Sequence, residues 1–342
     1  MKSFSSLQSL GIKFPIIQAP MAGVSTAEMC SKVTQFGGLG SLPFGSNIQS
    51  AIDSLNDFKL KYNTNKVNVN FFAHGVDNVV NDEMVSNWKK LYHGEKIVKN
   101  GNVSFKEFET FPQFNSFLTN LIDFKPLVVS FHFGLPSSKT IEQLKKSGIL
   151  VFATVTSVEE AKYCLSQSAD GLVLQGYEAG GHRGVFSEYD ELLSTDALFK
   201  QVKSMNPDCF VIPAGGIVDT TTIQYYLDQG ASAVQLGTAF LTTDESLANK
   251  EMISNSDLPT IMTDLISGKP ARCIRTKFIQ DVEKNRVGPL PPYGWMYDGY
   301  KQWKAKQDGS KGFFLVGANY KQAKHGLSTE EVMENLTKDL KL

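Results

Sequence analysis

The sequence predicts an α/β protein built as a (β/α)8 TIM barrel with an inserted, mainly helical lid or substrate domain. Short apolar runs alternate with helical patterns along the 342 residues, which is typical of repeated βα units around a parallel sheet. Most of these runs are almost continuously apolar, as expected for strands that are buried on both faces. The first strand is not followed by the glycine pattern of a dinucleotide-binding fold, which favours a barrel over a doubly wound sheet.

Eight strands are expected, each bounded by turn-forming residues. They span Pro15–Met21, Leu39–Phe44, Val67–Ala73, Leu127–Phe133, Leu150–Val155, Gly171–Gln175, Cys209–Ala214 and Ala233–Phe240. The helices between them have recognisable ends. Ser157 and Glu160 form a capping-box pattern, and Asp219 is a typical N-cap for a helix that ends before Gly230. This order of elements supplies the eight strands that the barrel requires.

Two segments do not follow the βα order, and we expect them to form a separate domain. Residues 77–120 are rich in Asn, Lys and Phe and are too long for an ordinary βα loop. Residues 244 to about 286, which follow the last strand, have a helical pattern. The expected barrel therefore comprises residues 1–76, 121–243 and about 287–342, and the expected lid or substrate domain comprises residues 77–120 and about 244–286.

The composition restricts the classes of partner. The net charge is −1, from 34 Lys and Arg against 35 Asp and Glu, and no basic block stands out, so we expect neither nucleic acid nor a membrane as a partner. The four cysteines are widely spaced, which fits free thiols and indicates no metal site. No apolar run reaches the about 18 residues of a membrane span, and the N-terminus lacks a targeting pattern. We therefore expect a cytoplasmic protein that acts on a small molecule.

Glycines follow the last two strands of the predicted barrel. Gly215 and Gly216 come after the seventh strand, and Gly237 and Thr238 lie near the end of the eighth. In barrels of this kind these two loops commonly bind phosphate through backbone N–H groups. Two questions stay open here: the glycines could serve only tight turns, and a phosphate could belong to a substrate or to flavin mononucleotide (FMN).

An apolar turn after the first strand favours the flavin. Residues 19–23 offer small side chains and backbone to a flat isoalloxazine ring, and the amides of Asn70, Gln175 and Gln235 suit its pyrimidine edge or ribityl chain. A sugar phosphate would instead call for several charged residues at the mouth of the barrel, and few are present.

The stretch Gln175–Gly184 follows the sixth strand and carries a histidine among four glycines. An imidazole titrates near neutral pH, so His182 is a candidate acid or base at the strand end. The alternative is a surface turn that happens to hold a histidine. Arg183 could attract an anion, although exposed loop arginines often do not, and the sequence identifies no partner for Glu178.

Several of these motifs resemble, in order and spacing, those of class I nitronate monooxygenases, formerly called 2-nitropropane dioxygenases. The Glu-Ala-Gly-Gly-His motif is shared with flavin-dependent enoyl and quinone reductases, whereas Ser-Phe-His-Phe-Gly-Leu-Pro narrows the resemblance to the nitronate enzymes. The resemblance covers most of the barrel and thins after about Ser267. It rests on Pro20–Ser25, Asn68–Asn70, Val129–Pro136, Glu178–Gly184, Ala214–Ile217 and Gln235–Phe240.

The resemblance implies an FMN enzyme, a monomer or homodimer, that oxidises alkyl nitronates such as propionate 3-nitronate with O₂ through a flavin semiquinone. Whether neutral nitroalkanes also react stays open. His182 matches the family's catalytic histidine, which accepts a proton from a nitroalkane or hydrogen-bonds an anionic nitronate. The residues that would contact the flavin are Met21, Ala22, Asn70, Gln175, Gly180, Gly181, Gly216, Gln235, Gly237 and Thr238.

Three further residues are candidates for substrate binding. His132 could line the pocket or be a packed histidine between two phenylalanines. Tyr297 and Lys301 resemble the family's tail residues that reach the nitronate, and a solvated helix end is the other interpretation.

An NAD(P)H-dependent flavin reductase for a quinone or an enoyl thioester is the alternative function. A flavin-free barrel for a phosphorylated metabolite and a non-catalytic binding protein are the more distant ones.

Overall fold

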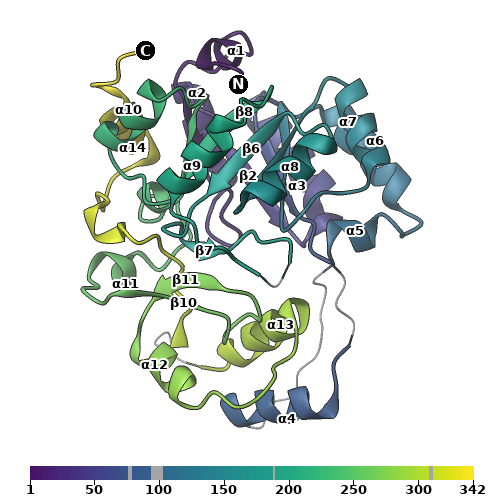
Figure 1. Cartoon of the computed structure of the whole chain (residues 1–342), viewed down its shortest axis with the longest axis vertical. Helices are drawn as coiled ribbons and strands as arrows, with labels where there is room; N and C mark the ends of the chain where they lie inside the picture. The colour runs from purple at the N-terminus through teal and green to yellow at the C-terminus, as the bar shows by residue number, and fades with distance from the viewer. Residues whose placement is uncertain (76–78, 94–102, 188, 308–310) are drawn as a thin grey trace.

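The fold is built around an eight-stranded parallel sheet. The computed structural model describes residues 1–75, 79–93, 103–187, 189–307 and 311–342. The sheet has the order β1-β9-β8-β6-β5-β4-β3-β2, and a parallel bridge between Ile17 and Leu39 joins its two edges, so the sheet closes into a barrel (Figure 1). Its strands are β1 (Ile16–Gln18), β2 (Ser41–Gly45), β3 (Asn68–Phe72), β4 (Val128–His132), β5 (Leu150–Val155), β6 (Gly171–Gln175), β8 (Phe210–Ala214) and β9 (Val234–Leu236).

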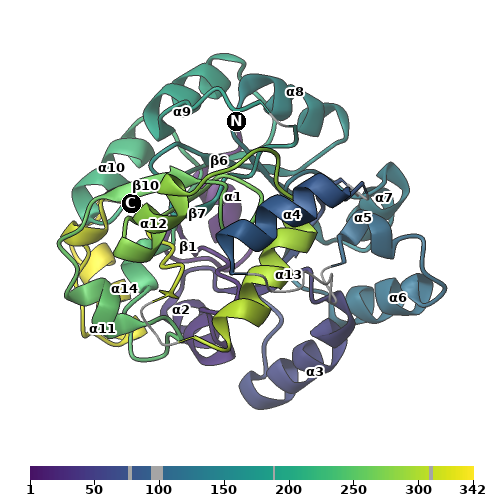
Figure 2. The same cartoon turned by 90° about the horizontal axis from the view of Figure 1, so that it is seen from below.

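The predicted fold class and all eight predicted strands are confirmed. The eighth strand is shorter than expected, because Gly237 ends it and residues Thr238–Phe240 form the short 3₁₀ helix η2. Helices surround the barrel (Figure 2). They include α2 (Ala27–Phe36), α3 (Ala51–Tyr62), α6 (Phe114–Phe124), α7 (Ser138–Lys146), α8 (Val158–Ser166), α9 (Thr195–Ser204), α10 (Thr220–Asp228) and α14 (Thr329–Thr337), with the short α1 (Phe4–Gln8) and α5 (Phe105–Phe108).

The predicted helix caps are present with one difference. The Asp219 carboxylate accepts a hydrogen bond from the Thr222 N–H at 2.8 Å, which caps α10. The Ser157 hydroxyl accepts from the Glu160 N–H at 3.2 Å, as a capping box requires. The Glu160 carboxylate, however, binds the N–H groups of Thr156 and Phe186 instead of the Ser157 N–H. Only half of the predicted capping box forms, because Glu160 ties α8 to the loop after β6.

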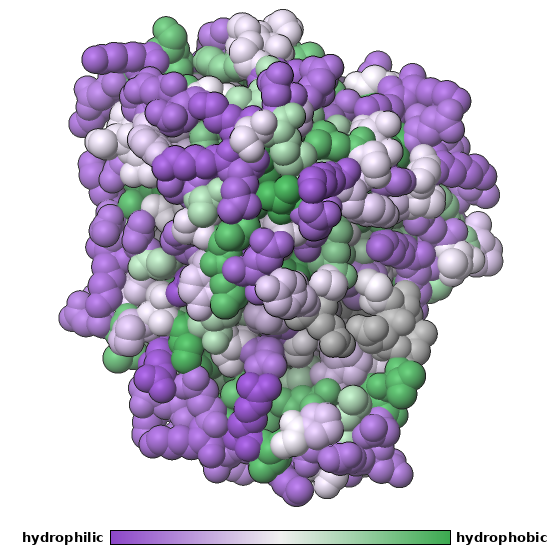
Figure 3. Space-filling view, in the orientation of Figure 1, coloured by the Kyte–Doolittle hydropathy of each residue, from purple (hydrophilic) through white to green (hydrophobic). Residues whose placement is uncertain are grey.

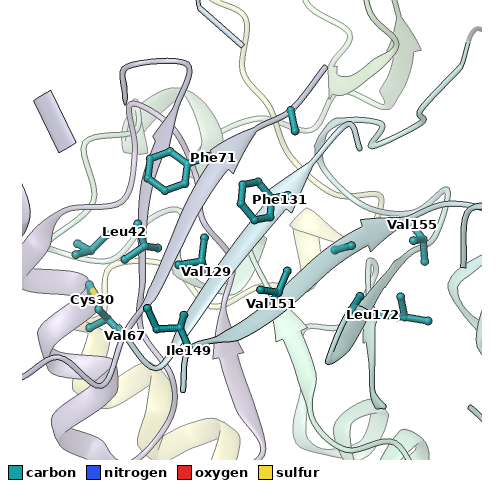
Figure 4. Packing of buried hydrophobic residues seen from close by; sticks show 14 of the residues in the cluster. Cys30, Leu42, Val67, Phe71, Val129, Phe131, Ile149, Val151, Val155 and Leu172 are labelled. Carbon is teal, nitrogen blue, oxygen red and sulfur yellow. The ribbon is translucent and has the colours of Figure 1, made fainter. Parts of the chain in front are cut away.

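Alternation along the strands creates two cores, one on each side of the sheet. Val129, Phe131 and Val151 point outward and pack under the surrounding helices (Figure 4). Their neighbours Val128 and Phe152 belong to the cluster that fills the barrel interior. At the carboxyl ends of the strands, the inward positions are taken by polar side chains instead, and this places them in one layer at the barrel mouth.

A smaller lobe lies against the carboxyl ends of the strands (Figures 1 and 2). It contains an antiparallel sheet with the order β10-β11-β7, and its aromatic core includes Trp88, Tyr92, Phe278, Tyr300 and Trp303. Its elements are β7 (Gly181–His182), β10 (Thr260–Thr263), β11 (Ala271–Ile274), α4 (Asp82–Leu91), α12 (Lys277–Lys284) and α13 (Tyr293–Lys304), with α11 (Lys250–Ser254) beside them.

The helical pattern expected from residue 244 to about 286 is wrong in its middle part. Residues 260–274 form a hairpin, in which Thr260 pairs with Ile274 and Thr263 with Ala271. The β-branched residues of both arms favour strands, and Gly268, with φ +79°, supplies a left-handed turn between them.

Side-chain packing divides the chain at different points from the expected ones. Helix α5 and the first part of α6 lie within the segment expected for the lid, yet Phe105 contacts Phe71 and Phe131 of the barrel with ring centroids 5.1 Å apart in both pairs. Conversely, α13 lies in the segment expected for the barrel, but its Tyr300 and Trp303 are part of the small lobe's core. Each helix packs where its apolar side chains are buried. The position of a helix in the chain does not show which of the two cores that is.

The described parts of the chain contain no helix long and apolar enough to cross a membrane. Within the same residues, no group of three His, Cys, Asp or Glu side chains could hold a metal ion. The four cysteines are buried free thiols. Hydrophilic residues cover most of the face in Figure 3, with hydrophobic residues in small groups between them.

Candidate active site

A cavity lies at the carboxyl ends of the strands, between the barrel and the small lobe. Inward-facing residues of successive strands line one side, and Tyr293 and Tyr297 of α13 line another. All residues expected to contact the flavin line this cavity: Met21, Ala22, Asn70, Gln175, Gly180, Gly181, Gly216, Gln235, Gly237 and Thr238. His132, His182 and Tyr297 also line it, whereas Lys301 does not. Polar residues from five strands of the barrel thus meet where a (β/α)8 barrel carries its active site.

One end of the cavity has the features of a phosphate site. Gly216 has φ +70°, and a side chain there would place a Cβ 3.1 Å from the Glu178 Cβ. The N–H groups of Gly216 and Thr238 donate to no acceptor among the described residues. Free N–H groups in glycine-containing loops after the last two strands suit a phosphate, so this end fits the phosphate of a bound ligand.

The tail of the chain crosses the phosphate end. The segment 315–319 donates three hydrogen bonds here, from the Gly317 N–H to Thr238 Oγ1 at 2.9 Å, from Asn319 Nδ2 to the Gly216 carbonyl at 2.7 Å and from the Ala318 N–H to the Glu178 carbonyl at 2.8 Å. No local sequence pattern identifies this segment, because these three contacts join residues at least 79 positions apart.

Two of the three amides expected to serve the flavin differ in how they are held. Asn70 Nδ2 donates to Ser130 Oγ at 3.0 Å, which leaves Asn70 Oδ1 without a partner among the described residues. A free carbonyl oxygen in the cavity suits the imide N–H of a flavin ring. Gln175, by contrast, uses its amide on the following loop: Nε2 donates to the His182 carbonyl at 2.9 Å, and Oε1 accepts from the Gly184 N–H at 2.7 Å. Gln175 therefore shapes the histidine loop as well as the cavity wall.

His182 is held by its neighbours through both backbone and side chain. Its strand β7 pairs with β11, where Ala271 lies opposite His182. Its carbonyl accepts from Gln175 and, at 3.2 Å, from His132 Nε2. Its imidazole Nε2 lies 2.9 Å from the hydroxyl of Ser267, and the residue is only 9% exposed. No sequence pattern identifies Ser267 as a partner of His182, because Ser267 belongs to a hairpin whose sequence predicts a helix.

The environment of the two histidines favours their neutral forms. Burial, together with the charges of His132, Lys269 and Lys301, lowers the pKa of His182 from its usual 6.5 to about 3. Burial likewise lowers the pKa of His132 to about 4, although the hydrogen bond to the His182 carbonyl acts in the opposite direction. Since a carbonyl oxygen only accepts, His132 carries its proton on Nε2.

Aromatic rings and two ammonium groups surround the imidazole of His182. The rings of Tyr293 and Tyr297 lie edge to face with it, at centroid distances of 5.3 and 5.4 Å. Lys301 lies one helical turn beyond Tyr297, with its ammonium 4.2 Å from the tyrosine ring centroid and its side chain half exposed. The Lys269 ammonium lies 4.9 Å from the ring centroid of Phe133. This end of the cavity is apolar, with two ammonium groups near it, and the buried Asp298 carboxylate lies 3.6 Å from the ammonium of Lys301.

Arg183 and Glu178, whose roles the sequence leaves open, both bind other parts of the protein. Arg183 is fully buried and donates to the carbonyls of Gln175 and Gly176 at 2.7 and 2.8 Å, so it does not face a ligand. The Glu178 carboxylate accepts from the Thr195 N–H at 2.8 Å and thereby binds the first turn of α9. Arg272, which the sequence analysis did not select, donates twice to the Tyr177 carbonyl and fixes β11 to the same loop.

A buried histidine in an aromatic cavity, with a phosphate site on the last two strands of a (β/α)8 barrel, defines a class of cofactor-binding barrel enzymes. The model of the family described as nitronate monooxygenase matches residues 5–339. A relative from Saccharomyces cerevisiae is 40% identical and covers 99% of this chain and 94% of its own length. The nitronate monooxygenase of Paraburkholderia phytofirmans is 36% identical and covers 98% and 94%.

Solved structures agree with this assignment. The crystal structure of a nitroalkane oxidase from Streptomyces ansochromogenes superposes with a TM-score of 0.84 at 28% identity, covering 97% of both chains. The chain belongs to the nitronate monooxygenase family and is an oxidoreductase. Family membership also indicates a flavin cofactor.

Proposed function

We propose that this protein is an FMN-dependent monooxygenase that oxidises alkyl nitronates, propionate 3-nitronate among them, with O₂. The observation that carries the proposal is the position of His182, which lines the same cavity as the free N–H groups of Gly216 and Thr238. A flavin with its phosphate at those groups would extend along the cavity toward His182. When bound, a flavin would supply the redox chemistry that couples oxidation of the nitronate to O₂.

The protein's own groups bind and orient the substrate. The ammonium groups of Lys269 and Lys301 lie close enough to lower the pKa of His182, and the same field attracts an anionic nitronate. Tyr297 closes the cavity on the side of α13 and excludes water from the reacting carbon.

Oxygen consumption by the purified yellow protein with propionate 3-nitronate, with and without NADH, tests the proposal. We expect rapid consumption that does not depend on NADH, and FMN as the chromophore released on denaturation. Absence of turnover with any alkyl nitronate would contradict the proposal. Fast anaerobic bleaching of the flavin by NADH would instead support the reductase alternative.

A further inference from the structure

A buried turn at Ser267 lies directly against the imidazole of His182. Ser267 is fully buried, and its Oγ lies 2.9 Å from His182 Nε2 and 3.1 Å from the Lys269 carbonyl oxygen. A carbonyl only accepts, so the single hydroxyl proton of Ser267 is donated to Lys269. The serine oxygen must then accept from His182, which places the imidazole proton on Nε2.

We propose that Ser267 is a positioning residue that holds His182 in the Nε2–H tautomer and leaves Nδ1 as its proton-accepting nitrogen. Nδ1 has no hydrogen-bond partner among the described residues, and the residue lines the cavity. A second hydrogen bond of this kind is the usual way in which proteins select one tautomer of a functional histidine. This inference rests on the proposed function for its chemical meaning, but the tautomer itself does not depend on the substrate.

The turn that carries Ser267 is fixed from several sides. Gly268 has φ +79°, and a Cβ there would lie 2.8 Å from the backbone nitrogen of Tyr293, so only glycine fits. The Gly268 N–H donates to the Asp264 carbonyl at 2.8 Å. On the other side of the turn, the Pro270 carbonyl accepts from the Arg183 N–H at 2.8 Å, next to the histidine. Ser267 and His182 are therefore held in one rigid unit, as tautomer selection requires.

The tautomer decides between two roles for His182. An imidazole with Nε2 engaged and Nδ1 unprotonated accepts a proton and does not donate one to an anionic nitronate. With a neutral nitroalkane, the C–H bond beside the nitro group breaks, the proton moves to Nδ1, and the electron pair is delocalised into the nitro group to give the nitronate. With a nitronate supplied as such, no proton needs to move. The proposal therefore assigns Ser267 to the use of neutral nitroalkanes.

Nitrogen NMR of the flavin-bound protein with ¹⁵N-labelled histidine tests the tautomer directly. The His182 signals are identified by their loss in His182→Asn. We expect a protonated Nε2 and an unprotonated Nδ1 in the wild type, a mixture of tautomers in Ser267→Ala, and the wild-type pattern in Ser267→Thr, which keeps the hydroxyl. A protonated Nδ1 in the wild type, or an unchanged tautomer in Ser267→Ala, would overturn the proposal.

Kinetics with matched substrates separate positioning from a merely structural effect. In Ser267→Ala, kcat/KM should fall about 100-fold for a neutral nitroalkane and change within about twofold for its preformed nitronate, because only the former needs the base. Equal losses with both substrates, or a wild type that does not oxidise nitroalkanes, would refute the base role. Ser31→Ala is the control, since Ser31 is a buried serine on α2 whose hydroxyl has no hydrogen bond. Failure of the proposed function would appear separately, as an absence of oxygen consumption with nitronates.

Discussion

The guanidinium of Arg183 and the carboxylate of Asp190 form a buried two-point ion pair. Arg183 Nε lies 2.7 Å from Asp190 Oδ2, and Nη2 lies 2.9 Å from Oδ1. The arginine side chain is fully buried and that of the aspartate is 9% exposed. The remaining nitrogen, Nη1, donates to the carbonyls that end β6. Arg183 thus stabilises the loop that carries the neighbouring candidate catalytic residue, His182.

Replacing Asp190 should destabilise the protein strongly. In Asp190→Ala the buried guanidinium loses its counter-charge, and removing one partner of such a pair commonly costs about 3 to 5 kcal/mol in the free energy of unfolding. Urea denaturation of both proteins measures the loss. Glu142→Ala is the control, because Glu142 pairs with Lys146 on the exposed surface of α7, and it should leave the denaturation midpoint almost unchanged. A midpoint for Asp190→Ala equal to that of the control would show that the pair does not stabilise the loop.

The barrel and the cavity wall could be predicted from the sequence because they depend on local patterns. Apolar runs give the strands, and Ala19, Asn70 and Gln175 near the strand ends must gather at one end of a parallel barrel. This geometric rule places these strand-end groups at the cavity, whereas the full set of expected flavin contacts follows from the family resemblance.

The other contacts of the site depend on packing between distant segments. Ser267 meets His182 across 85 positions, through a hairpin whose strands are too short for a clear alternation. Arg183 follows the histidine, and the sequence alone could not show that it turns into the protein toward Asp190. Lys301 was selected by resemblance, and the helix that carries it places its side chain outside the cavity lining.

The stability of the protein should depend on pH through Glu245, which joins two helices. Its carboxylate lies 2.7 Å from the Lys32 ammonium on α2 and accepts from the Thr329 N–H of α14 at 2.9 Å. Burial alone would raise the pKa of Glu245, but these hydrogen bonds outweigh it and lower the pKa to about 2. The lowered pKa stabilises the fold fully above the unfolded value of about 4.3, and this contribution is lost as the pH falls toward 2.

Comparison of the wild type with Glu245→Gln measures this contribution. The variant should unfold more easily at neutral pH, and the difference in free energy of unfolding should shrink as the pH falls from about 5 to about 3. Glu334→Gln, at an exposed position of α14, should follow the wild-type pH dependence. A constant difference between wild type and Glu245→Gln over this range would show that the carboxylate is not stabilised in the folded state.

The rate of nitronate oxidation should be independent of histidine ionisation near neutral pH. Because burial and the nearby positive charges lower the pKa of His182 to about 3, the imidazole is already neutral at higher pH. We expect kcat/KM for a preformed nitronate to stay constant between about pH 5.5 and 8. Steady-state oxygen consumption across this range checks the expectation. An ionisation with a pKa of 6 to 7 that disappears in His182→Asn would show that the histidine is protonated in the working enzyme.

The phosphate end of the cavity can be tested at Gly237, where a side chain has room. A Cβ at this position would meet only the Ala19 Cβ at 3.4 Å and the Met21 Sδ at 3.6 Å, so small side chains fit without displacing backbone. Gly237→Asp would set a carboxylate beside the phosphate and should give largely flavin-free protein, because two neighbouring anions repel each other strongly. Gly237→Asn has nearly the same shape without the charge and should retain much more flavin. The ratio of flavin absorbance to protein, with circular dichroism to confirm folding, measures both variants. Equal flavin content in the two would show that no phosphate binds beside Gly237.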